Sequence, residues 1–302
     1  MMKILFADLY DTLIIQGYAR SEQIYNSREK EIKIVTNYIN EFLMAGNYVV
    51  IVTNPGAHDS FEKTFNYTMT LINNHILQHL RSQILFYVQG ECVNIPDDII
   101  QKNINNKIHF FGKQGLSAIH VNKKEDAITD FLNNIKMPYQ LFAIGDSARD
   151  IPMLLKLQEL GGQSSFIDTH FYSQDVTTDT VIENELYTEF HFEYQKIIRN
   201  MSIEEQIKGT NEQANLLHQK RCERKQELYR ILYEGKLELE KLSKRYHNFI
   251  ECVNYQILND NSFSKGDMFY QNYPFNESIV KSVVDMQLYP SFEDYYIKVL
   301  RK

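Results

Sequence analysis

The first half of the chain alternates short apolar runs with longer segments of helical periodicity. Lys3–Leu9 and Tyr48–Thr53 are nearly continuous apolar runs, which indicates strands that are buried on both faces. Between them, Arg28–Ala45 carries apolar residues every three or four positions, as an amphipathic helix does. Further strands are expected over residues 83–88, 140–145 and 163–168, and further helices over 58–80, 124–132 and 150–160. This alternation predicts an α/β fold with a parallel, Rossmann-like sheet.

The second half shows helical periodicity without comparable strands. Residues 182–199 and 204–256 predict long helices, because charged positions alternate with leucines at helical spacing, and a break is expected near Gly209. Ser, Thr and Asp cluster between Asp168 and Glu183, as they do in linkers. We therefore expect an α/β domain over residues 1–175 and an all-α domain over residues 176–302. The Tyr- and Phe-rich tail is expected to be buried rather than to stack on bases.

The composition is typical of a globular protein from a reducing compartment. Hydrophobic residues make up 43% of the 302 residues and charged residues 24%. The three cysteines are widely spaced, which does not favour a disulfide framework or a cysteine zinc site. No apolar run approaches the ~20 residues of a membrane span. Asp8 and Asp11 interrupt the apolar N-terminus, which argues against a secretory signal. We expect a cytoplasmic protein.

The charge is distributed unevenly along the chain. Residues 201–302 contain 15 basic and 15 acidic side chains, so the net charge of −7 falls on the first 200 residues. An acidic α/β domain does not favour nucleic acid as a partner. Residues 220–245 contain nine Lys and Arg against five acids. This is typical of a solvated helix face with i,i+4 ion pairs. The alternative is a basic face for anionic lipid or for an acidic protein partner.

Polar side chains occur where strands end or helices begin in four segments. They are Asp8, Thr53, Lys124 and the acidic pair Asp146 and Asp150. The carboxyl ends of parallel strands meet at one edge of the sheet, where ligands bind. A carboxylate at that edge can attack phosphorus, and together with the acidic pair it can hold Mg²⁺ in oxygen ligands. The Thr53 hydroxyl and the Lys124 ammonium can bind phosphoryl oxygens.

The order of these segments resembles the haloacid dehalogenase-like (HAD) superfamily over about residues 3–168. The first family motif, an apolar strand followed by D-x-D-x-T, matches FADLYDT, and the second, a strand that ends in Thr or Ser, matches VVIVT. The third is a Lys, here in KEDAI, and the fourth, G-D-x-x-x-D before an apolar helix, matches GDSARDIPML. The first and last motifs are the specific ones. The resemblance implies a HAD core and, in its phosphatase branch, phosphomonoester hydrolysis.

The resemblance also implies roles for individual residues. Asp8 would be the nucleophile that forms an aspartyl-phosphate, and Thr53 would bind the phosphoryl group. Lys124 would neutralise the charge of Asp8 and of the phosphoryl group. The neighbouring Lys123 competes with Lys124 for that role. The implied Mg²⁺ ligands are Asp8, the backbone carbonyl of Tyr10, Asp146 and, directly or through water, Asp150.

One position departs from the family pattern. Family phosphatases carry an Asp two residues after the nucleophile as general acid and base, whereas this chain has Tyr10, followed by Asp11. Metal-independent dehalogenases resemble the sequence here, with D-x-Y-G-T, but they lack the acidic pair in this form, and such a pair repels itself without a cation. We therefore expect a phosphatase, with Asp11 or the substrate as candidate proton donor. A metal-independent dehalogenase-type hydrolase and a non-catalytic HAD scaffold or binding module are the alternatives.

The gaps between the motifs are too short for the cap domain of family members that act on metabolites, although the helical domain over residues 176–302 could itself cover the site as a lid. Residues 13–47 separate the first two motifs, and the segment from Gln89 to Lys124 offers similar room. Capless relatives include protein phosphatases, so the expected substrate is a phosphorylated protein, such as one with phosphotyrosine, and a small phosphoester is the alternative. A HAD phosphatase joined to a helical module also loosely resembles bacterial effector tyrosine phosphatases of the Legionella type. That resemblance would place the chain in the host cytosol at a membrane face.

Overall fold

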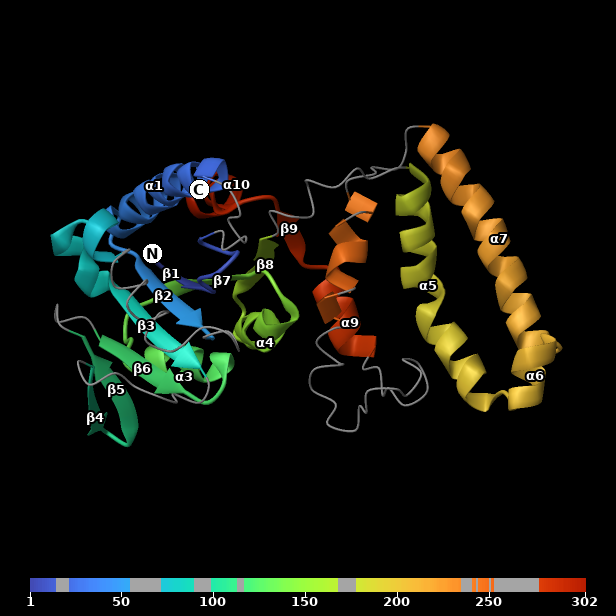
Figure 1. Ribbon diagram of the computed structural model, residues 1–302, viewed down its shortest axis with the longest axis horizontal. Helices are drawn as coiled ribbons and strands as arrows, with labels where there is room; N and C mark the ends of the chain where they lie inside the picture. The colour runs from blue at the N-terminus through green and yellow to red at the C-terminus, as the bar shows by residue number, and fades with distance from the viewer. Residues whose placement is uncertain are drawn as a thin grey trace. The chain divides into compact units, whose positions relative to one another are not determined.

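A computed structural model describes most of the chain, which divides into two compact units (Figure 1). The described residues are 1–14, 22–54, 72–89, 99–112, 117–167, 178–234, 241–252 without 243 and 250, and 277–302. The first unit comprises residues 1–172 and 288–302, and the second comprises residues 173–287. Most of the helix expected over residues 58–80 lies outside the described residues.

The first unit is built on a nine-stranded, mostly parallel sheet with the order β4-β5-β6-β3-β2-β1-β7-β8-β9. The strands are β1 (Met2–Ala7), β2 (Tyr48–Thr53), β3 (Ile84–Gln89), β4 (Ile100–Ile104), β5 (Lys107–Phe111), β6 (Ser117–Val121), β7 (Tyr139–Gly145), β8 (Gln163–Ile167) and β9 (Gln287–Tyr289). The helices of this unit include α1 (Glu22–Met44), α3 (Lys124–Leu132), α4 (Ile151–Glu159) and α10 (Phe292–Tyr295). The predicted α/β fold with a parallel sheet and a helical region after it is confirmed.

The sheet is covered on both faces, which explains why its central strands are apolar without interruption. Leu5 and Ala7 of β1 belong to the core that also contains residues of α1. Successive side chains of a strand point to opposite faces. Phe6 therefore lies on the other face, where its ring meets Phe131 of α3 edge to face, with 5.8 Å between the centroids. Figure 1 shows α1 and α10 over one face and α3 and α4 over the other.

The end of the chain returns to the first unit and packs against α1. The ring of Tyr296 lies 4.9 Å from that of Tyr38 between centroids, and the Tyr38 hydroxyl donates a hydrogen bond of 2.8 Å to Glu293. Lys3 donates a hydrogen bond of 2.7 Å to the carbonyl of Leu300. In the aromatic tail, the described residues Tyr289, Phe292, Tyr295 and Tyr296 are buried, as expected, and the aromatic residues before position 277 lie outside the described residues. Residues 288–302 lie in the α/β unit, although they were expected in the helical domain.

A β-hairpin that the sequence analysis did not predict extends the sheet beyond β6. β4 and β5 pair with each other in antiparallel fashion, and β5 pairs antiparallel with β6. The two residues of the turn, Asn105 and Asn106, have φ angles of 53° and 64°. Two successive residues with positive φ are typical of the type I′ turn, whose twist matches that of the strands it joins. Asn is one of the few residues other than Gly that adopts this conformation readily.

The second unit is helical and contains α5 (Thr178–Asn200), α6 (Ile203–Lys208), α7 (Glu212–Tyr233) and α9 (Glu277–Val284). α5 and α7 pack through buried Ile182, Leu186 and Leu228. The helix break expected near Gly209 is confirmed, because Gly209 ends α6 in the left-handed conformation. Among the described residues, no helix is both long and apolar enough to cross a bilayer.

Candidate functional site: an acidic cluster around a buried lysine

Asp8 lies at the carboxyl end of β1, in the middle of the sheet. Its side chain is buried, and its backbone N–H donates a hydrogen bond of 3.1 Å to the carbonyl of Ile144 on the neighbouring strand β7. Because β1 and β7 are parallel neighbours, the residues that follow both strands emerge side by side. The pairing of the two strands therefore brings Asp8 next to Asp146 and the turn that contains it.

The turn after β7 is organised around Asp150. One oxygen of Asp150, Oδ2, accepts hydrogen bonds from the backbone N–H groups of Asp146 and Ser147, at 3.0 and 3.1 Å, and from the Ser147 hydroxyl at 3.2 Å. Gly145 leaves the room that Asp150 occupies, because a Cβ atom on Gly145 would lie 2.3 Å from the Cβ of Asp150. Gly145 and Ser147 both lie within the fourth motif, but the sequence alone indicated no individual role for either residue.

Lys124, at the start of α3, supplies the positive charge of the site. Its side chain is buried, and its Nζ lies 2.6 Å from Oδ1 of Asp8 and 2.5 Å from Oδ1 of Asp150. The competing Lys123 is exposed, and its backbone N–H bonds the side chain of Asp126 in the first turn of the helix. The structure therefore selects Lys124 over Lys123 as the residue that meets Asp8.

Three carboxylates converge at the edge of the sheet. Oxygens of Asp8, Asp146 and Asp150 all lie within 4.8 Å of one another, so the cluster could hold a metal ion. Thr12 donates a hydrogen bond of 3.3 Å to Oδ1 of Asp146, a contact that the sequence analysis missed, although Thr12 belongs to the first motif. With all three carboxylates ionised and Lys124 protonated, the cluster carries a charge of about −2. An all-oxygen donor set with excess negative charge fits a hard divalent cation.

Burial and mutual repulsion change the protonation equilibria of the cluster. Burial raises the pKa of Asp8 to about 6, although the nearby Lys124 ammonium opposes the change. Burial and the charges of Asp150 and Asp8 raise the pKa of Asp146 well above its usual value. Burial alone would lower the pKa of Lys124, but the carboxylates of Asp150 and Asp8 outweigh it and raise that pKa. A divalent cation would relieve the repulsion that holds the carboxyl pKa values up.

Thr53 lies at the carboxyl end of β2, next to β1. Its side chain is fully buried, and its hydroxyl has no hydrogen-bond partner in the described part of the chain. The register pairs Ala7 with Ile51, so Thr53 lies level with Leu9, just after Asp8. A buried hydroxyl without a partner is costly, and a ligand oxygen at this edge of the sheet would satisfy it.

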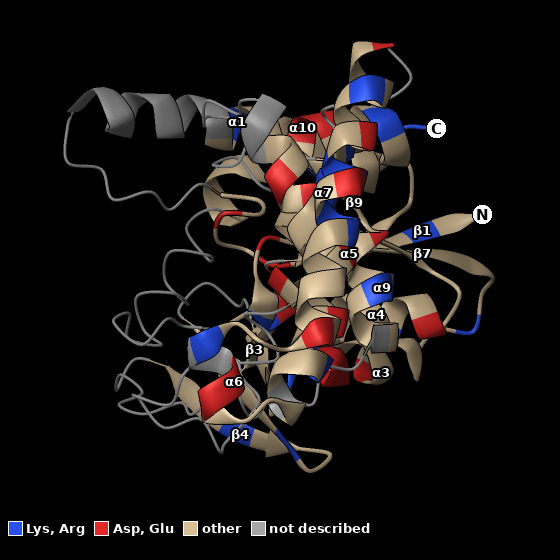
Figure 2. Ribbon diagram, turned by 90° about the vertical axis from the view of Figure 1, so that its right-hand side faces the viewer, with Lys and Arg blue, Asp and Glu red and all other residues tan. Residues whose placement is uncertain are grey.

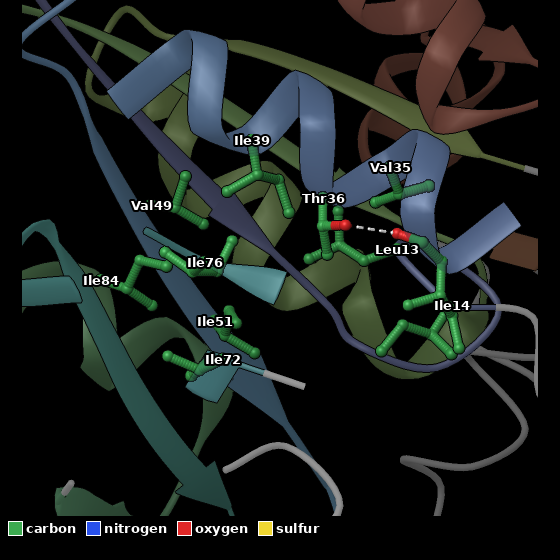
Figure 3. A pocket seen from close by; sticks show the side chains of 11 residues that line it. Leu13, Ile14, Val35, Thr36, Ile39, Val49, Ile51, Ile72, Ile76 and Ile84 are labelled. Carbon is green, nitrogen blue, oxygen red and sulfur yellow. Dashed lines mark hydrogen bonds between the residues drawn. The ribbon is translucent and has the colours of Figure 1, made fainter. Parts of the chain in front are cut away.

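The loop after Asp8 is anchored by apolar side chains. Figure 3 shows Leu13 and Ile14 in an apolar pocket together with Val35 of α1 and Ile51 of β2. Upstream in the loop, Asp11 has a φ of 56°, a left-handed conformation that Asp tolerates better than most residues. The anchored loop holds the first motif at the sheet edge. Tyr10 is half-buried in this loop, and contact of its carbonyl with a metal stays a prediction.

The basic residues of α7 mostly form pairs with acids of α5. Arg221 and Lys225 both contact Glu183, and Arg224 lies 3.0 Å from Glu189. Figure 2 shows acidic and basic positions along both helices. Several of the basic side chains that could have bound anionic lipid or an acidic protein partner are therefore already paired within the helical unit.

The chain matches no protein-family model, and no curated protein is significantly similar to it. The arrangement of its own residues therefore has to carry any conclusion about function.

Proposed function

We propose that the chain is a Mg²⁺-dependent phosphomonoester phosphatase of the HAD type that works through an aspartyl-phosphate on Asp8. The observation that carries the proposal is the acidic cluster, in which Asp8, Asp146 and Asp150 meet around a single buried Lys124. Such an excess of negative charge is expensive to bury without a cation. The order of the four motifs along the sequence adds independent support.

The residues at the edge of the sheet divide the proposed reaction among them. A carboxylate oxygen of Asp8 attacks phosphorus, so that a bond from Asp8 to phosphorus forms and the bond to the leaving oxygen breaks. Lys124 and Thr53 hold the phosphoryl oxygens as their charge develops. Water then attacks the phosphorus of the aspartyl-phosphate, which releases inorganic phosphate and restores Asp8. Asp8, Asp146 and Asp150 would hold the Mg²⁺, which would supply charge neutralisation.

The residue at position 10 favours substrates with a good leaving group. A positioned general acid contributes about 10²- to 10⁴-fold in rate, and Tyr10 stands where family phosphatases have that acid. A phenolate, with a pKa of about 10, leaves more readily without protonation than an alkoxide does. Phosphotyrosine on a protein is therefore the proposed substrate class.

Tyr10 also supports a second candidate, a metal-independent hydrolase of the dehalogenase type. In that reaction Asp8 would displace a leaving group from carbon and Lys124 alone would balance its charge. The acidic pair argues against this candidate, because Asp146 and Asp150 have no evident use there and raise the energy of the ionised Asp8. A third candidate is a non-catalytic scaffold, which would bind the metal ion at the acidic cluster but would not hydrolyse a substrate.

The test is hydrolysis of para-nitrophenyl phosphate and of a phosphotyrosine peptide by the wild type and by Asp8→Asn, each with Mg²⁺ and with EDTA. We expect turnover with Mg²⁺ alone and a loss of at least about a thousandfold in Asp8→Asn, because the nucleophile is removed with little change of shape. Thermal unfolding with and without Mg²⁺ reports metal binding separately. Turnover of a haloacid in EDTA would favour the dehalogenase type, and Mg²⁺ binding without any turnover would favour the scaffold.

A further inference from the structure

The outer strand of the hairpin, β4, is an exposed edge of the sheet. All five residues of β4 are exposed, and Ile100 and Ile104 retain 57% and 38% of their accessible surface. Natural proteins usually shorten, cover or charge such edges, because unpaired backbone groups there bind other strands. An open edge that carries two isoleucines is therefore a surface on which an extended chain can pair.

The register places the tip of this hairpin at the same edge of the sheet as Asp8. β5 runs back beside β6 with His109 opposite Ile119, so Lys107 lies level with Val121, at the carboxyl end of β6. The turn between β4 and β5 follows directly and extends beyond that level. An extended chain that leaves β4 at this end therefore emerges on the side where the carboxyl ends of the parallel strands, and Asp8, are found.

The pairing of β4 with β5 determines which backbone groups of β4 point away from the sheet. Residues that flank a two-residue hairpin turn form a hydrogen-bonded pair, and such pairs alternate along the strands. Ile104 and Lys107 flank the turn. Ile104 and Lys102 therefore direct their backbone groups towards β5, and Gln101 and Asn103 direct theirs outward. These outward groups are the ones that an added strand would use.

The charge of the hairpin favours an acidic partner. Residues 100–111 contain two lysines and no acid, but Lys107 pairs with Asp130 of α3, so the positive charge that the hairpin offers to a partner is that of Lys102. The ammonium of Lys102 lies 5.6 Å from the centre of the Phe111 ring, which fixes a positive charge on the face that Lys102 shares with the two isoleucines. The edge thus combines backbone groups, apolar side chains and positive charge.

We propose that β4 is a docking edge for the substrate, where an extended, acidic segment of the phosphorylated polypeptide pairs as an additional strand. Addition of a strand to an open edge is a common mode of peptide recognition, in which backbone bonds supply affinity and alternate side chains supply specificity. The inference rests on the proposed function, since it names the part of a protein substrate that the site itself does not contact.

The sheet geometry sets the length of substrate that can use this edge. An added strand lies one spacing beyond β4, so six strand spacings separate it from β1 in the sheet. At about 4.8 Å each, they amount to about 29 Å, which an extended chain crosses with about nine residues. A peptide therefore needs about nine residues between its phosphotyrosine and the segment that pairs with β4. A peptide with only two residues on each side of the phosphotyrosine is too short.

The test compares Asn103→Pro with Asn103→Ala on an acidic phosphotyrosine peptide of about 18 residues, on a five-residue one and on para-nitrophenyl phosphate. Proline removes the outward N–H of Asn103, which an edge strand tolerates, whereas alanine keeps that N–H. We expect Asn103→Pro to raise KM for the long peptide about tenfold and to leave kcat and the other two substrates unchanged. Asn103→Ala should match the wild type. An equal KM for the long peptide in all three proteins would overturn the proposal.

A binding measurement separates this proposal from the proposed function. Fluorescence anisotropy of the labelled long peptide needs no turnover, and we expect Kd to rise about tenfold in Asn103→Pro, with an unchanged circular dichroism melt as the check on folding. If para-nitrophenyl phosphate is not hydrolysed, the proposed function fails, but this Kd comparison still decides the docking edge. Equal Kd values would overturn it. A wild-type dimer that Asn103→Pro dissociates would assign the edge to a second copy and would overturn it as well.

Discussion

Acidic and basic side chains pair in two regions of the molecule, and their surroundings differ. At the edge of the sheet, Lys124 lies between Asp8 and Asp150, and all three side chains are buried. In the helical unit, Arg221 and Lys225 share Glu183, and these side chains keep 40–42% of their accessible surface. The residue types are the same in both places, but only the first set is removed from water.

The direction of the pKa shifts shows what this difference does. Hydrogen bonding by Lys225, with the charge of Arg221, lowers the pKa of Glu183, as an ordinary surface ion pair does. Burial raises the pKa of Asp8 to about 6 even though Lys124 lies 2.6 Å away. Water screens the surface pair, so each contact contributes little. Water does not screen the buried cluster, so its carboxylates can interact strongly with a bound cation or with a substrate.

The largest stability effect is expected at the buried lysine. Lys124→Met leaves the carboxylates of Asp8, Asp146 and Asp150 without their counter-charge and should lower the free energy of unfolding by about 3–5 kcal/mol. The matched control is Lys123→Met, one residue away and exposed, which should change it by less than about 0.5 kcal/mol. Urea unfolding of both variants in EDTA measures the difference. Equal effects at the two positions would contradict the buried charge balance.

A buried titratable group in the helical unit tests whether burial, rather than membership of the α/β unit, causes the large pKa shifts. Burial lowers the pKa of His191 from 6.5 to about 4, and its ring lies 4.9 Å from Tyr187 and 5.3 Å from Phe249. Below about pH 6.5, His191 is protonated in the unfolded chain but stays neutral in the folded chain. The free energy of unfolding therefore falls as the pH drops from 6.5 towards 4, by up to about 3 kcal/mol.

The measurement is the free energy of unfolding of wild type and His191→Phe between pH 4 and 7.5. The phenyl ring suits the aromatic neighbours and does not titrate. We expect the two proteins to differ by a constant amount above pH 6.5, and the variant to gain relative to the wild type below it. Parallel pH profiles over the whole range would show that His191 is not responsible.

A smaller effect is expected where Gly145 makes room for Asp150. A methyl group there would overlap the Asp150 side chain, so Gly145→Ala should cost about 1–3 kcal/mol and reduce turnover in the proposed phosphatase reaction. Gly46→Ala is the control, because Gly46 has a φ of 80° but no atom within 4 Å of an added Cβ. The control should lose about 1 kcal/mol by backbone strain and keep its turnover. Unaltered turnover in Gly145→Ala would show that the position of the Asp150 side chain does not affect the reaction.

The smallest effect is expected at the surface pairs. Arg224→Gln removes contacts with Glu189 and Glu227 and should lower the free energy of unfolding by less than about 1 kcal/mol. The difference from the wild type should shrink further at ~0.5 M salt, where charges are screened over a few ångströms. A loss that persists at high salt would mean that Arg224 stabilises α7 through packing rather than through charge.

Much of the candidate site could be predicted because its residues occupy recognisable places in the sequence. Asp8 and Thr53 follow apolar strands, and Asp146 and Asp150 lie in the turn between a strand and a helix, so parallel pairing alone brings them to one edge. The hairpin was not predicted because Asn105 and Asn106 form its turn without the Gly that usually marks a turn. In addition, the only apolar residues of β4 are the isoleucines at its two ends, so the strand shows little alternation of apolar and polar residues.

The sequence by itself determined the α/β fold, the helical region after it and the four segments of the site, because a buried strand requires a continuous apolar run and a sheet aligns its strand ends. Only the tertiary structure decided which lysine reaches the acids, since Lys124 and Asp8 lie 116 residues apart and the choice depends on the orientation of α3. It also decided where the tail packs. The aromatic residues of 288–302 required burial, but which apolar surface covers them depends on contacts with α1, which no local pattern records.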